Sequence, residues 1–148
     1  MTSEEPGIWP SVDFALLADA VQAAQGKLYV LGGGWDTLFV QSFPARHASL
    51  GIGVRVRVPW SWADQPVLIS VDLQDEDGAR VLPSEPLTHG IRVARPQGFP
   101  EGTDIGLVRA FTFTNLVIPH EGAYSFVISL NQVVTDRLRF TVRPRPQS

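Results

Sequence analysis

The sequence contains no cysteine among its 148 residues. This absence excludes disulfide bonds, cysteine nucleophiles, and zinc or iron–sulfur sites built on thiolates. Only 18% of the residues are charged, and the formal net charge is −3. Because a basic surface is missing, we expect neither a nucleic acid nor a membrane as a partner.

Long hydrophobic runs are missing as well. No stretch of about 18 apolar residues occurs, so we expect no membrane-spanning helix. The acidic start, MTSEEPG, lacks the apolar segment of a signal peptide, and we expect a cytoplasmic protein. The length predicts one domain over residues 1–148, with 1–10 and 143–148 as flexible tails.

Alternation of apolar and polar residues is the main pattern that is present. Residues 50–58 alternate strictly, which predicts a strand with an apolar face and an exposed face that carries Gly51, Gly53, Arg55 and Arg57. Further strands are predicted at 28–31, 67–73, 79–82, 90–94, 109–118, 124–130 and 138–142, with a bulge near Asn115 and turns at 75–78 and 131. Seven to nine such strands predict an all-β fold, namely an antiparallel β-sandwich of immunoglobulin-like or related Greek-key topology.

Residues 11–25 allow two interpretations. Phe14, Leu17, Ala18 and Val21 have helical spacing and alanine is frequent, which favours a helix. The β pattern downstream favours a strand that turns through Gln25-Gly26 into a hairpin. We expect the strand.

The segment from Leu116 to Phe126 resembles the tyrosine corner of immunoglobulin-like folds, in which a tyrosine hydroxyl ties a crossover between sheets. The tyrosine here is Tyr124. The alternative is an ordinary core tyrosine. The cysteine pair and core tryptophan of antibody domains do not occur.

Three consecutive glycines, Gly32–Gly34, follow an apolar run. They indicate a bend that carries the chain between sheets, or a close approach of another backbone or ring. A phosphate-binding loop is the other interpretation, but no helix pattern follows.

The stretches 14–20 (FALLADA) and 26–35 (GKLYVLGGGW), together with Gly-x-Tyr-x-Phe at 122–126, resemble a family of small bacterial, actinobacterial-type proteins of unknown function. The motif Gly-Lys-Leu-Tyr-Val-Leu-Gly-Gly-Gly-Trp carries most of the resemblance, which implies no activity.

Tryptophans supply the best candidate binding residues, namely Trp60 and Trp62, together with Trp35 and Asp36. Tryptophan anchors protein interfaces and stacks on sugar rings. The alternative is that Trp60 and Trp62 cap the core.

Catalytic and metal-binding patterns are absent. His47, His89 and His120 lack metal-ligand spacing, and the acids between Asp72 and Asp77 fit a solvated turn better than a calcium loop. We therefore expect no catalytic residue, no metal and no cofactor.

Arginine pairs on two strands, 55/57 and 137/139, are predicted to line outward faces. The expected function is a non-enzymatic module that binds a protein partner or itself. The alternative is a small-ligand or carbohydrate-binding module that uses the loop tryptophans.

Overall fold

The computed structural model describes residues 8–83 and 85–146. The described chain contains strands and a single 3₁₀ turn, η1 (Trp60–Trp62), which confirms the all-β prediction. The nine strands are β1 (Ser11–Ala24), β2 (Lys27–Gly33), β3 (Thr37–Val40), β4 (Ala45–Val58), β5 (Pro66–Asp75), β6 (Leu87–Arg92), β7 (Ile105–Ile118), β8 (Gly122–Leu130) and β9 (Val133–Pro144).

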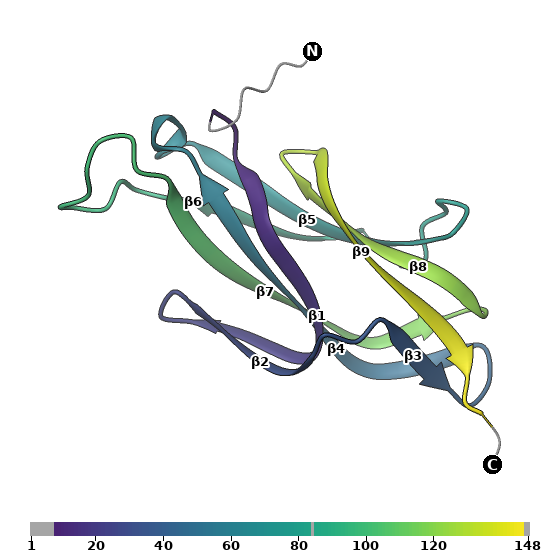
Figure 1. The fold of residues 1–148 in the computed structure, drawn as a ribbon. Coiled ribbons are helices and arrows are strands. Elements are labelled where there is room, and N and C mark those ends of the chain that lie inside the picture. The colour runs from purple at the N-terminus through teal and green to yellow at the C-terminus, as the bar shows by residue number, and fades with distance from the viewer. Residues whose placement is uncertain (1–7, 84, 147–148) are drawn as a thin grey trace.

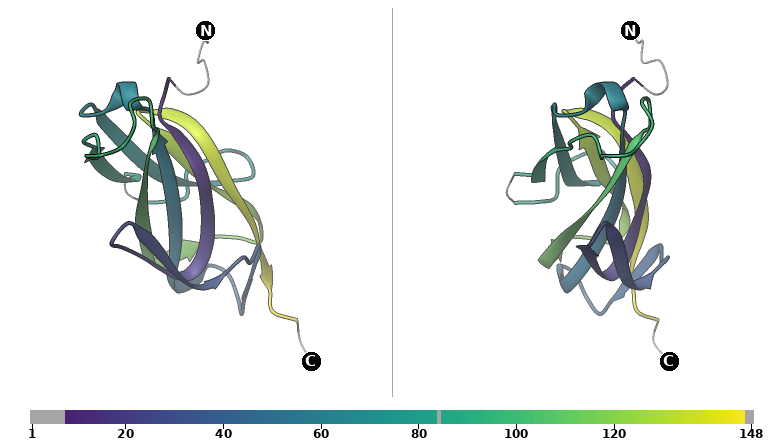
Figure 2. Two further views of the ribbon diagram at one scale, coloured as in Figure 1. Left: turned by 60° about the vertical axis from the view of Figure 1, so that its left-hand side comes forward. Right: turned by 90° about the vertical axis from the view of Figure 1, so that its left-hand side faces the viewer.

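The strands form two sheets in a sandwich-like arrangement (Figure 1). Sheet A has the order β2-β1-β4-β7, and sheet B has the order β3-β9-β8-β5-β6. Every neighbouring pair is antiparallel except β3 and β9, which run parallel. Sheet B is curled, so that its strands wrap toward sheet A (Figure 2).

The alternating residues form the core as the sequence predicts. In β4, β5 and β8 the apolar members of each alternation are buried, and residues of both sheets join one hydrophobic cluster. The largest fully buried side chains are those of Tyr124, Phe111 and Phe126. Sheet A and sheet B therefore enclose a single hydrophobic core.

Residues 11–24 form a strand, β1, followed by a two-residue turn at Gln25 and Gly26. Gln25 and Gly26 adopt φ values of 53° and 74°, and Ala24 pairs with Lys27 across the turn. Two consecutive residues with positive φ match the twist of a tight hairpin. The predicted hairpin is confirmed, and its tip projects beside the two sheets (Figures 1 and 2).

The hairpin also covers part of sheet A that the sequence predicts to be exposed. Gly51 and Gly53 are buried, because Val21 and Leu28 pack on the face of β4 opposite to the core. A Cβ atom at Gly51 would lie 2.8 Å from the backbone nitrogen of Val21. The exposed-face prediction is therefore wrong at these two glycines, which make room for the hairpin. The same face remains exposed at Arg57 and half-exposed at Arg55.

The Gly32–Gly34 triplet carries the chain out of sheet A. Gly32 and Gly34 have φ values of 68° and 93°, a region that favours glycine, and the Gly34 N–H donates to the Leu17 carbonyl at 3.2 Å. The chain then enters β3 in sheet B. The bend between sheets is thus the interpretation that the structure supports.

Tyr124 lies near the start of β8, just after the crossover from β7 in sheet A to sheet B. Its hydroxyl donates to the His120 carbonyl at 2.6 Å, and its buried ring stacks on Phe140 with centroids 5.7 Å apart. The predicted tyrosine-corner contact is confirmed, and the ring is at the same time part of the core.

Several predicted boundaries differ from the structure. Ala79–Leu82 is not a strand and makes only an isolated bridge between Gln74 and Arg80. The strand predicted at 90–94 lies at Leu87–Arg92, and residue Asn115 has a φ of 51° where a bulge was expected. Arg143 and Pro144, expected in a tail, belong to β9. The outermost parts of both predicted tails, 1–7 and 147–148, lie outside the described residues.

Candidate functional site

Trp60 and Trp62 lie in the η1 turn between β4 and β5. The turn is closed by hydrogen bonds from Trp62 N–H to the Pro59 carbonyl (2.8 Å) and from Ala63 N–H to the Trp60 carbonyl (3.2 Å). Arg95, from the loop after β6, places its guanidinium 4.8 Å from the Trp60 ring centroid. Its Nε and Nη2 also donate to the Trp60 carbonyl at 3.2 and 3.1 Å, so the cation is held in place.

Trp62 connects the core to the surface. It packs against the core cluster, and its buried indole N–H has no hydrogen-bond partner among the described residues. Trp9 lies against it, with ring centroids 5.2 Å apart, and is 47% exposed. We call Trp9, Trp60, Trp62 and Arg95 the tryptophan end. Trp60 and Trp62 were predicted from the sequence, whereas Arg95 was not, because 33 or more residues separate it from them.

Trp35 and Asp36 lie at the opposite end of the sandwich. Trp35 packs edge-on against Phe140, with centroids 6.2 Å apart, beside the first residues of β8. The Asp36 carbonyl accepts a hydrogen bond from Thr141 N–H at 2.9 Å. η1, in contrast, precedes β5, whose early residue Ile69 pairs with Leu130 at the far end of β8. The four predicted residues therefore do not form one site.

The histidines lie in three separate places. His47 and His89 belong to β4 and β6 rather than to loops, and His120 lies in the β7–β8 turn. His89 stacks on Phe111 with centroids 4.2 Å apart, and burial, aided by the nearby charge of Arg109, lowers its pKa from the usual 6.5. The three histidines therefore do not form a shared site.

The acids between Asp72 and Asp77 do not converge on a shared point. Asp72 pairs with Arg80, with Nε–Oδ2 at 2.6 Å. Asp75 Oδ1 accepts hydrogen bonds from the N–H groups of Asp77 (2.9 Å) and Ala79 (3.0 Å), so it shapes the turn. Within residues 8–83 and 85–146, no three acidic or histidine side chains are placed to share a metal ion.

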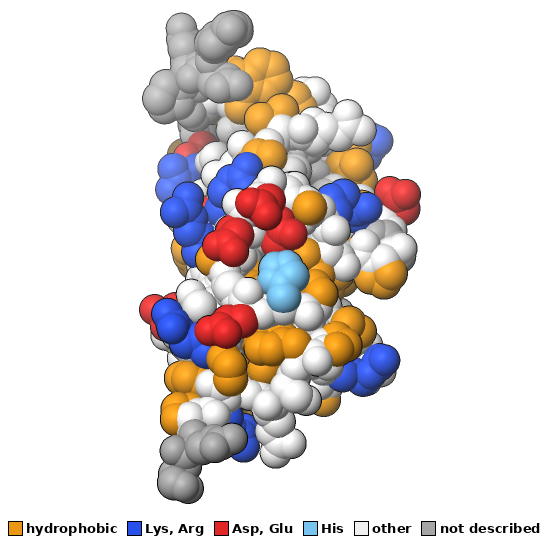
Figure 3. All heavy atoms as spheres, turned by 90° about the vertical axis from the view of Figure 1, so that its right-hand side faces the viewer, with side chains coloured by type: hydrophobic (Ala, Val, Ile, Leu, Met, Phe, Trp, Pro, Cys, Tyr) orange, Lys and Arg blue, Asp and Glu red, His pale blue; other side chains and the backbone are white. Residues whose placement is uncertain are grey.

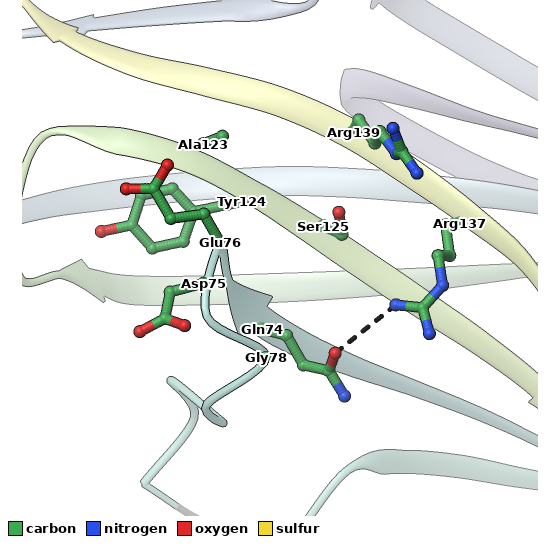
Figure 4. A pocket seen from close by; sticks show the side chains of 9 residues that line it. All are labelled: Gln74, Asp75, Glu76, Gly78, Ala123, Tyr124, Ser125, Arg137 and Arg139. Carbon is green, nitrogen blue, oxygen red and sulfur yellow. Dashed lines mark hydrogen bonds between the residues drawn. The ribbon is translucent and has the colours of Figure 1, made fainter.

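A shallow pocket of about 350 Å³ opens next to this turn. Asp75 and Glu76 lie on one side and Arg137 and Arg139 on the other, with Arg137 Nη1 3.5 Å from Gln74 Oε1 (Figure 4). Acidic side chains gather near a histidine on the side of the molecule that carries the β7–β8 turn (Figure 3). No pattern in the sequence predicts this pocket, because β5 and β9 are far apart in the chain.

The surroundings of the Tyr124 hydroxyl, which lies near this pocket, shift its pKa. Burial raises its pKa above the usual 10.0, and the hydrogen bond to the His120 backbone opposes this increase. The nearby carboxylates of Asp75 and Glu76 raise the pKa further. The hydroxyl is therefore a donor held neutral and bonded to a backbone carbonyl.

Comparison with known proteins adds a family but no activity. Residues 13–143 match the model of a family of unknown function, DUF6941. No curated protein matches the sequence significantly. No helix in the described part of the chain is long and apolar enough to cross a membrane.

Proposed function

The chain belongs to the DUF6941 family of unknown function, and we propose that it is a non-enzymatic module that binds another protein through the tryptophan end. The observation that carries the proposal is the exposed Trp9 ring, which packs against Trp62 in the same turn that holds the Trp60–Arg95 pair. Tryptophan and arginine are the residue types that contribute most to binding at protein interfaces.

The tryptophan end is preorganised for such a role. Arg95 is already fixed by its two hydrogen bonds to the Trp60 carbonyl, and Trp62 is anchored in the core. Side chains that are ordered before binding lose less conformational entropy when a partner arrives. A partner with an apolar patch next to a carboxylate would match both the Trp9 ring and the Arg95 charge.

Three of the side chains that could perform acid–base chemistry make structural contacts, which supports a non-enzymatic role. His89 stacks on Phe111, Asp72 pairs with Arg80, and Asp75 accepts the hydrogen bonds of its own turn. An activated pair needs a base within hydrogen-bond reach of its nucleophile or substrate.

Affinity capture with cross-linking from the cell that encodes the protein tests this proposal. Three baits are compared: the wild-type chain, a Trp9→Ser variant, and a Val117→Ser control. The control removes a similarly exposed apolar group on β7. We expect the wild-type and control baits to capture the same partner protein. The amount captured by the Trp9→Ser bait should be lower by about tenfold or more. Equal retention by all three baits would overturn the proposal.

The small-ligand alternative receives less support from the geometry. Arg95 lies over the Trp60 ring, and Trp62 and Trp35 are partly buried against the core, so Trp9 is the most exposed tryptophan ring for a sugar. A glycan array read together with tryptophan fluorescence separates the two functions. A saturable fluorescence change with any sugar would favour the alternative.

The finer features of fold and location also belong to this proposal. The parallel β3–β9 pair, the order β9-β8-β5-β6 and the tyrosine corner at the β7–β8 crossover all support an immunoglobulin-like topology with one added strand, β2. We further propose a bacterial, cytoplasmic protein, on the basis of its composition.

A further inference from the structure

The pocket beside the turn after β5 has charges of opposite sign on its two sides. Asp75 and Glu76 line one side, and the guanidinium groups of Arg137 and Arg139 lie on the other (Figure 4). Its volume of about 350 Å³ falls within the range of small-molecule sites. The two acids and two arginines balance each other, so a ligand with a charge of only one sign would meet a like charge on one side. The pocket therefore favours a ligand that carries both charges.

The arginine side can hold one anionic group. Arg137 and Arg139 are two residues apart on β9, so both side chains leave the same face of sheet B, with Cα atoms roughly 7 Å apart. Arg137 Nη1 contacts Gln74 Oε1 at 3.5 Å, whereas the Arg139 guanidinium makes no hydrogen bond or ion pair with any described residue. A guanidinium fork matches the two oxygens of a carboxylate. The Ser125 hydroxyl, on the floor of the pocket, adds a further donor.

The acidic side has one carboxylate that the turn does not use. Asp75 Oδ1 accepts the N–H groups of Asp77 and Ala79, so this side chain is engaged in the turn. The Glu76 carboxylate makes no hydrogen bond or ion pair within the described part of the chain. It lies over the start of β8, where a Cβ added at Gly122 would be 3.1 Å from Oε1. Glu76 is therefore the group that can receive a cation.

The spacing of the strands sets the length of the ligand. Ser125 pairs with Arg139 on one side and with Gln74 on the other, so the backbones of Arg139 and Gln74 are two strand spacings apart, or roughly 10 Å. Glu76 follows Gln74 by two residues, beyond the end of β5. A ligand that reaches both sides must cross the floor at Ala123 and Ser125. Its two charges must therefore be several bonds apart, and an α-amino acid is too short.

We propose that this pocket binds a small zwitterion, with a carboxylate held by Arg137 and Arg139 and a primary ammonium held by Glu76. This is the chemistry of an ω-amino acid or of a short peptide with free ends. The inference does not rest on the tryptophan end. The pocket lies at the last residues of β5, whereas η1 precedes the first, so the capture experiment above and the experiments below can fail independently.

A titration followed by nuclear magnetic resonance, at low ionic strength, tests the ligand class. The probe is 6-aminohexanoate, and its controls are hexanoate, hexylamine and glycine, which lack the ammonium, the carboxylate or the length. We expect 6-aminohexanoate to shift the amide signals of Ala123 and Ser125 saturably, with a dissociation constant about tenfold or more below that of each control. Triglycine should bind at the same place. Tighter binding of triglycine would identify a peptide as the source, and tighter binding of 6-aminohexanoate an ω-amino acid.

Substitutions test the role of each side of the pocket. Arg139→Gln and Glu76→Gln should each raise the dissociation constant of 6-aminohexanoate by about three- to tenfold, because each removes one charge contact. The matched controls, Arg143→Gln on the same strand and Asp77→Asn in the same turn, remove residues that do not line the pocket and should change it by less than about twofold. Glu76→Gln should also bind hexanoate as tightly as 6-aminohexanoate, an effect that damage to the turn would not produce.

Three results would overturn the inference. One is the absence of saturable shifts at Ala123 and Ser125 with both zwitterions. The second is equal affinity of the wild-type protein for hexanoate and 6-aminohexanoate, because the pocket would then hold only an anion. The third is equal weakening by the pocket variants and their controls, which would make net charge rather than the pocket responsible.

Discussion

Tyr124 shows how much one hydroxyl contributes to this fold. Its ring is buried between Phe140 and the core, and its O–H donates to the His120 carbonyl at 2.6 Å. Tyr124→Phe keeps the ring and removes the hydrogen bond. We expect the free energy of unfolding in urea to fall by about 1 kcal/mol, since a typical net hydrogen bond contributes that amount. Tyr29→Phe, on the exposed strand β2, is the control and should change little.

The same hydroxyl predicts a loss of stability at high pH. Burial raises the pKa of Tyr124 in the folded state above 10.0, the value expected in the unfolded chain. Above pH 10 the unfolded chain releases a proton that the folded chain keeps, so the folded state loses stability as pH rises. Urea midpoints at about pH 8 and pH 10.5 should differ more for wild type than for Tyr124→Phe. Equal differences would show that Tyr124 is not the responsible group.

The lowered pKa of His89 predicts that the protein loses stability at low pH. Its folded-state pKa lies below 6.5 because of burial and, to a lesser extent, Arg109. Below pH 6.5 the unfolded chain binds a proton more readily than the folded chain does, so stability falls as pH decreases. The urea midpoint of a His89→Gln variant should therefore fall less between pH 7 and pH 5 than that of wild type.

The β1–β2 hairpin is the element whose position depends most on single residues. An added Cβ at Gly51 would meet the Val21 backbone nitrogen at 2.8 Å, whereas at Gly53 it would meet side-chain tips, Leu28 Cδ1 at 3.0 Å and Val21 Cγ1 at 3.1 Å. Backbone cannot move aside as a side chain can. Gly51→Ala should therefore cost about 1–3 kcal/mol of unfolding free energy, and Gly53→Ala clearly less.

The control for these substitutions is Gly90→Ala in β6, where no atom lies within 4 Å of the added Cβ. That variant should be neutral or slightly stabilising, because alanine reduces the freedom of the unfolded chain. Hydrogen exchange should show that Gly51→Ala also loses protection in β2. Equal effects at Gly51 and Gly53 would contradict the proposed packing.

These glycines also show what the sequence can predict about an element. Alternation in residues 50–58 identified β4 and its buried face, because the period of two is a local property of a strand. The burial of Gly51 and Gly53 depends on Val21 and Leu28, which come from another part of the chain. Residues 11–24 likewise form a strand through pairing with β2 and β4, although their local propensity favours a helix.

At the scale of the whole molecule, the sequence predicted candidate site residues better than it predicted which of them lie together. Trp60, Trp62, Trp35 and Asp36 share a setting between strands, but η1 and β3 lie at opposite ends of β8. Arg95 and Trp9 complete the tryptophan end only after folding. Which loops share an end depends on the crossovers between sheets, and no local pattern encodes them.

The shared core predicts that both ends of the molecule unfold together. Trp35 packs against Phe140 at one end, Trp62 packs into the core at the other, and residues of both sheets join one cluster. A chain of this size with one core is expected to unfold in a single cooperative step. A variant in which Trp9, Trp60 and Trp62 are replaced by Phe reports on Trp35 alone. The urea midpoint from its fluorescence should equal the midpoint from far-UV circular dichroism. In the Trp35→Phe variant the fluorescence reports on the tryptophan end instead, and its two midpoints should also agree. Separate midpoints in either variant would show that the two ends lose their structure independently.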